Sequence, residues 1–122
     1  MKELQSIQNL LGLARRSGKL ARGAGEVRTQ LRNRKCKLVL MAADCGNALR
    51  RDLTYLCGKQ QVPFITLLTK QELGQATGSD DKAAIAVLDI HFAQGILKHW
   101  TALANRKDGI EYAEKRNENQ NK

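Results

Sequence analysis

Basic side chains and glycines are interleaved in residues 13–27, LARRSGKLARGAGEV, where four cations and three glycines share fifteen positions. Lysine and arginine bind phosphate, and glycine lets a phosphate group approach the backbone because it has no Cβ. Three interpretations are open for such a stretch: a cradle for the phosphates of a nucleotide, a flexible surface loop, or the start of a helix that docks on nucleic acid.

The nucleotide interpretation depends on a glycine fingerprint that is incomplete here. RGAGEV supplies a G-x-G, but the third glycine of a dinucleotide motif is absent and no apolar strand precedes it. The chain also has no glycine–lysine pair followed by serine or threonine, as a P-loop requires. A nucleotide cofactor is therefore not expected.

A helix that begins at Gly23 or Ala24 explains the stretch better. The first N–H groups of a helix are unpaired and carry the positive end of its dipole, so they attract anions. Glu26 then has two explanations, which stay open: it complements the dipole in the first turn, or it accepts a hydrogen bond from a base amino group. The cations expected to surround the helix start are Lys19, Arg22, Arg28 and Arg32.

The positive charge of the chain is concentrated near this stretch. The 122 residues include 21 Lys and Arg against 12 Asp and Glu, a net charge of +9. Ten of the basic residues but only two of the acids lie in residues 1–37, a balance of +8, whereas the other 85 residues contribute +1. Such a field favours a polyanion, and we expect nucleic acid as the partner. Aromatic residues are scarce, so base stacking on several rings is disfavoured.

Catalytic and metal-binding groups are not expected. Asp80 and Asp81 are adjacent in a GSDDK turn, which is typical of solvated loop carboxylates. His91 is interpreted as an exposed residue in the first turn of a helix, not as a base or a ligand. We therefore expect no enzymatic activity, no cofactor, no metal and no small-molecule substrate.

The three cysteines show no zinc-ligand spacing and predict free thiols, which favours a cytoplasmic protein. Cys36 and Cys57 are expected in the core, because each lies beside or within an apolar pattern. Cys45 is expected in a loop. No apolar run approaches membrane-spanning length, so no membrane association is expected.

The hydrophobic pattern predicts the elements that must hold these residues. Apolar residues at helical spacing predict a first helix that ends before Gly18, and residues 19–21 suggest a short strand. Continuous apolar runs at 37–43, 62–68 and 83–89 are typical of strands buried on both faces. A second helix is expected to leave Arg28, Arg32 and Arg34 free to face water.

Capping residues mark the later helices. Asn47 and Asp89 are predicted as N-caps, and Thr69 with Glu72 as a capping box. The alternation of helices and strands predicts an α/β sandwich, with one central mixed sheet and helices on both faces. It forms one domain over residues 1–104, and residues 105–122 are expected to be a charged, flexible tail.

Four stretches in order also resemble a known family. NLLGLARRSGKLARG, KCKLVLMAADC, CGKQQVPFITLLTKQELGQATG and AAIAVLD are similar to the kink-turn-binding ribosomal proteins. That family includes archaeal large-subunit and box C/D particle proteins and the bacterial YlxQ-like RNA-binding proteins, which the chain resembles most. The likeness runs from about Leu4 to Trp100. It implies a three-layer α-β-α sandwich with a four-stranded mixed sheet, and a non-catalytic RNA-binding role in or around the ribosome.

The resemblance also implies where RNA docks. In the family, the loop and helix start that correspond to residues 23–26 enter the kinked duplex, where an Asn–Glu pair addresses sheared G·A pairs. Glu26 matches this glutamate, which supports its role as a base acceptor alongside the dipole role. Lys70 matches a lysine that contacts phosphate.

Other positions depart from the family pattern. Gly25 stands at the asparagine position, and Thr29 stands where a lysine is usual, so two side-chain contacts are missing. Gly46 replaces an acidic residue that some members aim at a flipped-out base. The second RNA-facing loop, commonly apolar, reads Ser79-Asp80-Asp81-Lys82 here, and Lys82 must offset the acids next to it.

These observations predict an RNA-binding protein that recognises structured, kink-turn-like RNA and works with the ribosome. The alternative is a protein–protein adaptor of the translation machinery that uses the same basic face. The residues expected to contact phosphates are Arg15, Arg16, Lys19, Arg22 and Arg32. The expected RNA-binding residues are Lys19, Arg22, Gly23, Gly25, Glu26, Arg28, Thr29, Arg32, Asp44, Gly46, Lys70, Asp81, Lys82 and Ala83.

Overall fold

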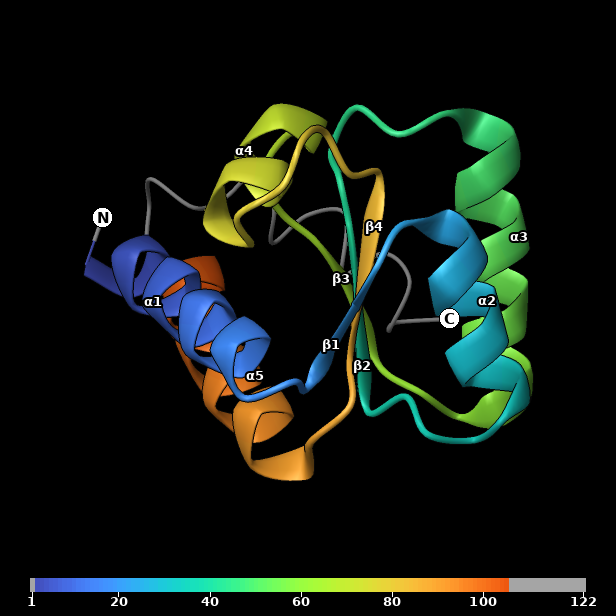
Figure 1. Cartoon of the computed structure of the whole chain (residues 1–122), viewed down its shortest axis with the longest axis horizontal. Coiled ribbons are helices and arrows are strands. Elements are labelled where there is room, and N and C mark those ends of the chain that lie inside the picture. The colour runs from blue at the N-terminus through green and yellow to red at the C-terminus, as the bar shows by residue number, and fades with distance from the viewer. Residues whose placement is uncertain (1, 106–122) are drawn as a thin grey trace.

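Helices and strands alternate along the chain in the order predicted from the sequence (Figure 1). The computed structural model describes residues 2–105, so all of the predicted tail except Asn105 lies outside the described residues. The elements are α1 (Lys2–Arg16), β1 (Leu20–Arg22), α2 (Ala24–Arg32), β2 (Leu38–Met41), α3 (Asn47–Gln60), β3 (Phe64–Thr66), α4 (Lys70–Ala76), β4 (Ala84–Val87) and α5 (Ile90–Ala104).

The strands form one four-stranded mixed sheet in the order β1-β4-β2-β3. Strands β2 and β3 run parallel, whereas β4 runs antiparallel to both β1 and β2. Helices α1, α4 and α5 cover one face of the sheet, and α2 and α3 cover the other (Figure 1). The predicted three-layer sandwich with a mixed sheet is therefore confirmed.

The central strands explain the continuous apolar runs. Every residue of β2 and of β4 is buried, because helices lie on both sides of these strands. In the run at 62–68 only three residues form β3, but Leu67 and Leu68 after it are still buried. Within the described residues, no helix is both long and apolar enough to cross a membrane.

Two of the three predicted caps are confirmed. Thr69 and Glu72 form the reciprocal capping box at the start of α4, and the Asp89 carboxylate accepts from the N–H groups of His91 and Phe92. The prediction for Asn47 is wrong: Gly46 is the N-cap residue of α3, with no side-chain cap, and Asn47 is already helical. The first turn closes one residue earlier than predicted.

Candidate nucleic-acid interface

Loops from distant parts of the chain meet at one end of the sheet. Because β1, β2 and β3 point the same way and β4 points the opposite way, the ends of the first three strands lie beside the start of β4. The four segments that meet there lie around the upper end of the sheet in Figure 1. We call them the loop cluster: residues 23–26, 42–46, 67–70 and 79–83.

Hydrogen bonds hold these segments together. The Ala42 N–H donates to the Ala83 carbonyl over 2.9 Å, which joins the second segment to the fourth. The Lys70 N–H donates to the Asp44 carboxylate over 2.8 Å, and the Lys82 N–H donates to the Lys70 carbonyl over 3.0 Å. Asp44, Lys70, Lys82 and Ala83, all predicted site residues, are therefore neighbours in space.

The start of α2 lies on this surface, and the predicted helix start at Gly23 or Ala24 is confirmed. Gly23, its N-cap residue, has φ 100° and ψ 152°, a backbone conformation that favours glycine. Its N–H donates to the Ala84 carbonyl over 2.9 Å, which joins the first segment to the start of β4. A Cβ added at Gly23, Gly25 or Gly46 would meet no atom within 4 Å. Another chain can therefore approach the backbone closely at all three glycines.

Glu26 lies in the first turn of α2 with its side chain exposed. No hydrogen bond or ion pair joins its carboxylate to another residue between Lys2 and Asn105. The Thr29 hydroxyl, one turn later, donates to the Gly25 carbonyl over 3.1 Å. The carboxylate is therefore available to a ligand, and the dipole and base-acceptor explanations both remain open.

The four cations predicted to surround the helix start are not all there. Lys19 lies at the opposite end of β1, where its carbonyl accepts from Leu88 N–H over 2.8 Å. Arg32 ends α2, about 12 Å along the axis from Ala24 at a rise of about 1.5 Å per residue. Strand β1 leads toward Gly23 and helix α2 leads away from it. Lys19 at the far end of the strand and Arg32 at the far end of the helix are therefore both distant from the helix start.

The two remaining cations both have partners. The Arg28 Nε donates to the Asp52 carboxylate of α3 over 2.6 Å, so Arg28, which was predicted to be free to face water, is paired although its side chain is still partly exposed. Their side chains are 37% and 41% exposed, and such a solvent-screened pair contributes little to stability. The Arg22 Nη1 donates to the Thr77 carbonyl over 2.9 Å, at the end of α4.

Positive charge lies beside the loop cluster and not in it. The cluster holds two lysines, Lys70 and Lys82, and four acids, a balance of −2. Lys82 lies 3.5 Å from Asp80, which offsets one of the acids next to it. The Ser79 hydroxyl and Lys82 together lower the pKa of Asp80. The Arg50 guanidinium contacts the cluster at the Ala42 carbonyl, and further cations lie around the end of α4: Arg22, Arg15 against Gly78, and Arg16 close to Gly12 and the Ala76 carbonyl.

Arg50 is a supporting residue that the sequence analysis missed. Its guanidinium donates to the Thr66 hydroxyl over 3.0 Å and to the Ala42 carbonyl over 3.3 Å, which holds the loop after β2 against the end of β3. The signal was present, because Arg50, Leu53 and Cys57 follow helical spacing and share the inner side of α3. An arginine on the same side of a helix as buried residues indicates that its guanidinium makes hydrogen bonds inside the protein.

All three cysteines are buried, including Cys45, which was expected only in a loop. Burial raises the pKa of Cys36 to about 11 and the pKa of Cys57 to about 12. The predicted core positions of Cys36 and Cys57 are confirmed.

These thiols are expected to resist alkylation in the native protein. Iodoacetamide at about pH 8 reacts with thiolates, so native Cys36 and Cys57 should stay unmodified, whereas all three cysteines should react in concentrated guanidinium chloride.

The same thiols make the stability depend on pH. The unfolded chain loses the thiol protons of Cys36 and Cys57 from about pH 8.5 while the folded chain keeps them, so the free energy of unfolding should fall as the pH rises above that value. Mass spectrometry and denaturant titrations measure both effects. Rapid native labelling of Cys57 would contradict them.

Comparisons with known proteins agree with this architecture. The model of the ribosomal protein L7Ae/L30e/S12e/Gadd45 family matches residues 5–95. The RNA-binding protein YlxQ of Bacillus subtilis (strain 168) is 32% identical over 88 residues, 72% of this chain and 88% of that protein. The large ribosomal subunit protein eL8 of Cenarchaeum symbiosum (strain A) is 34% identical over 92 residues, 75% of this chain and 73% of that protein.

Solved structures show the same fold. A Bacillus halodurans protein of unknown function has a TM-score of 0.74 at 30% identity, over 76% of this chain and 94% of that chain. The Giardia lamblia 15.5 kD RNA-binding protein has a TM-score of 0.68 at 20% identity, over 81% of this chain and 85% of that chain. Since the family model spans all four strands and the loop cluster between them, the chain belongs to the ribosomal protein L7Ae/L30e/S12e/Gadd45 family.

Proposed function

We propose that the protein binds structured RNA through the loop cluster, without catalysis, and that its target is a kinked RNA of the ribosome or the translation machinery. The observation that carries this proposal is the uncovered start of α2, which a hydrogen bond joins to the start of β4, next to three loops that hydrogen bonds hold together. Relatives named as RNA-binding and ribosomal proteins support it.

Each part of the surface has a chemical role in this proposal. The unpaired N–H groups at the start of α2 face a phosphate, and Gly23 and Gly25 let it come close. Lys70 supplies a cation from the neighbouring loop. Arg28 can exchange the Asp52 carboxylate for a phosphate, because that ion pair is half-exposed and weak. Glu26 accepts a hydrogen bond from a base amino group.

The missing side chains at two positions shape the specificity. Gly25 offers no side-chain amide to a base, and the Thr29 hydroxyl already donates to the Gly25 carbonyl. Backbone groups and surface shape therefore carry more of the recognition than side chains do. The protein should tolerate a wider set of bent RNAs than a reader with a full set of base contacts.

A gel-shift comparison tests the proposal. One RNA contains a kink-turn, and its control has the same length but Watson–Crick pairs in place of the sheared G·A pairs. Preference for the kinked RNA supports the proposal. Equal affinity for these RNAs, for transfer RNA and for a synthetic polyanion would instead indicate the adaptor function, in which the surface meets an acidic protein.

Glu26→Ala is expected to reduce the preference for the kinked RNA, because the base acceptor is lost. A good base contact discriminates by about 1–3 kcal/mol, so the affinity ratio should fall by about fivefold or more. Glu3→Ala is the matched control, since it removes a first-turn carboxylate from α1. If Glu26→Ala leaves the ratio unchanged, Glu26 serves only the helix dipole.

A further inference from the structure

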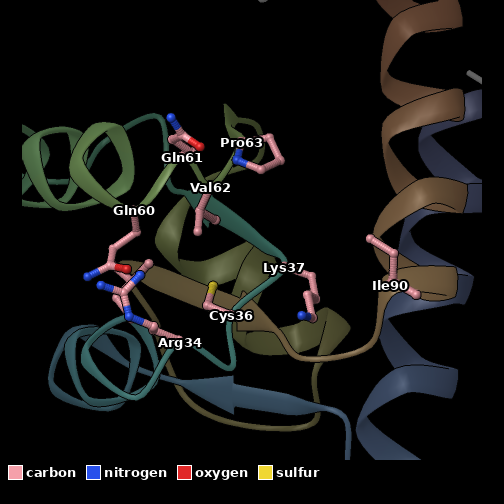
Figure 2. Close-up of a pocket in the computed structure, with 9 residues that line it drawn as sticks. Arg34, Cys36, Lys37, Gln60, Gln61, Val62, Pro63 and Ile90 are labelled. Carbon is pink, nitrogen blue, oxygen red and sulfur yellow. The ribbon is translucent and has the colours of Figure 1, made fainter.

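A pocket of about 290 Å³ lies at the end of the sheet opposite the loop cluster (Figure 2). The segment between α2 and β2 forms one side, and the segment between α3 and β3 forms the other. Cys36 and Val62 lie near its centre in the view, with Arg34 and Gln60 on one side and Lys37 toward the other.

The polar side chains around this pocket have no partner within the described residues. Arg34, Lys37, Gln60 and Gln61 line it, and none makes a side-chain hydrogen bond or ion pair with another residue of 2–105. Two cations and two amides therefore line the pocket beside Cys36, Val62 and Pro63, and no residue of 2–105 engages their side chains. An amide provides both a donor and an acceptor, and a guanidinium provides several donors.

The charge around the pocket is strongly positive. Residues 28–43 and 53–71, which supply all of its lining except Ile90, contain no acid. Asp89, next to Ile90 in the chain, is engaged in capping α5. The cations of these two segments are Arg28, Arg32, Arg34, Lys35, Lys37, Lys59 and Lys70, of which Arg28 is paired with Asp52 and Lys70 lies in the loop cluster. An anionic ligand is therefore favoured at this end.

The backbone presents two of these side chains at a conformational cost. Arg34 and Gln61 each have φ 59°, in the left-handed region where glycine is favoured. Both residues follow the end of a helix, and both turn their segment toward the pocket. At both positions the residue has a long polar side chain, although glycine would adopt this backbone conformation with less strain.

We propose that this pocket takes one unpaired nucleotide of the RNA bound at the loop cluster, an inference that rests on the proposed function. The base lies on the apolar surface of Val62 and Pro63, and the amides of Gln60 and Gln61 bond its edge. The phosphate lies between Arg34 and Lys37. The volume is at the lower end of the range for ligand pockets, about 300 Å³, which suits a single nucleotide unit.

Helix α2 connects the two surfaces. Its N-terminus opens at the loop cluster and its C-terminus leads into the pocket, about 12 Å further along its axis. An RNA strand that leaves the kinked segment along α2 passes Arg32 before it reaches Arg34. This path also gives a role to the cations at the end of α2, which are too far from the helix start to contact the kink.

The test compares two kink-turn RNAs, one blunt-ended and one with a short unpaired extension on both stems. The wild-type protein is expected to bind the extended RNA about fivefold more tightly at about 0.15 M salt, because Arg34 and Lys37 engage one additional phosphate. Gln60→Ala should weaken this preference, and Arg34→Ala with Lys37→Ala should abolish it, whereas both variants should keep the affinity for the blunt RNA. Gln94→Ala, an exposed glutamine on α5, is the matched control. Equal wild-type affinity for both RNAs would overturn the inference.

A second measurement separates this inference from the proposed function. Adenosine and uridine monophosphate are titrated into isotope-labelled protein, and the backbone amide shifts of Lys37, Gln60 and Gln61 are followed by NMR. Saturable shifts at these residues, absent with inorganic phosphate alone, support a nucleotide site even if neither RNA binds, in which case only the proposed function fails. No shifts, or equal shifts with phosphate or with a poly-glutamate peptide, would overturn the nucleotide assignment.

Discussion

Replacing Arg15, Arg16 and Lys70 together by glutamine is expected to weaken RNA binding about 100-fold at about 0.15 M salt. Lys70 belongs to the loop cluster and begins α4, and Arg15 and Arg16 lie against the end of the same helix. Each phosphate contact makes the affinity fall with roughly the 0.7–0.9 power of the salt concentration, and it is worth about fivefold in affinity at this salt concentration. The loss should be similar for every RNA, because phosphates carry no sequence information.

The salt dependence provides the measurement. A wild-type protein that engages five phosphates should show a log–log slope of about −3 to −5, and the triple variant a slope shallower by about 2 to 3. Lys2→Gln with Lys98→Gln, which removes exposed cations from α1 and α5, should leave the slope almost unchanged. A triple variant with the wild-type slope would show that RNA binds elsewhere.

Gly74→Ala is expected to destabilise the protein by about 1–3 kcal/mol, as overpacking of a close contact does. A Cβ on Gly74 would overlap the backbone carbonyl of Asp80, because the turn after α4 folds back over this glycine. The Ser79 N–H donates to the Gly74 carbonyl over 2.8 Å in the same turn. To make room, residues 79–83 must move away from α4, and the loop cluster loses its shape.

Gly58→Ala is the matched control, because Gly58 is also helical but a Cβ there would meet nothing within 4 Å. Alanine stabilises an exposed helix position by about 0.5–1 kcal/mol relative to glycine. Denaturant titrations should therefore show opposite signs for the two variants, and RNA affinity should fall only for Gly74→Ala. Equal stability of both would show that the turn adjusts without strain.

The layered fold could be predicted from the sequence because its signals are local. A run such as residues 83–89 has apolar side chains on both faces of a strand, which only a covered sheet accommodates. Thr69 and Glu72 are three residues apart, and Asp89 lies within three residues of the N–H groups that it caps. Buried strands and helix caps depend on residues a few positions apart, so a single sequence is enough to predict them.

The electrostatic arrangement could not be predicted because it depends on contacts between distant residues. Arg28 meets Asp52 across 24 positions and Arg22 meets Thr77 across 55, so neither partner is visible in the local pattern. Residues 1–37 do hold most of the net positive charge of the chain. Strand β1 and helix α2, however, place those cations toward both ends of the sheet and not around one helix start. The pocket likewise arises only where the ends of two helices meet.

The outer strands of the sheet have a consequence for how copies of the protein meet one another. Strands β1 and β3 are three residues long, shorter than the inner pair, and Pro63 just before β3 has no N–H to offer. Each edge of the sheet therefore has too few unpaired backbone N–H and C=O groups for a strand of another copy to extend the sheet. Concentrated solutions should therefore resist fibrous aggregation through these edges.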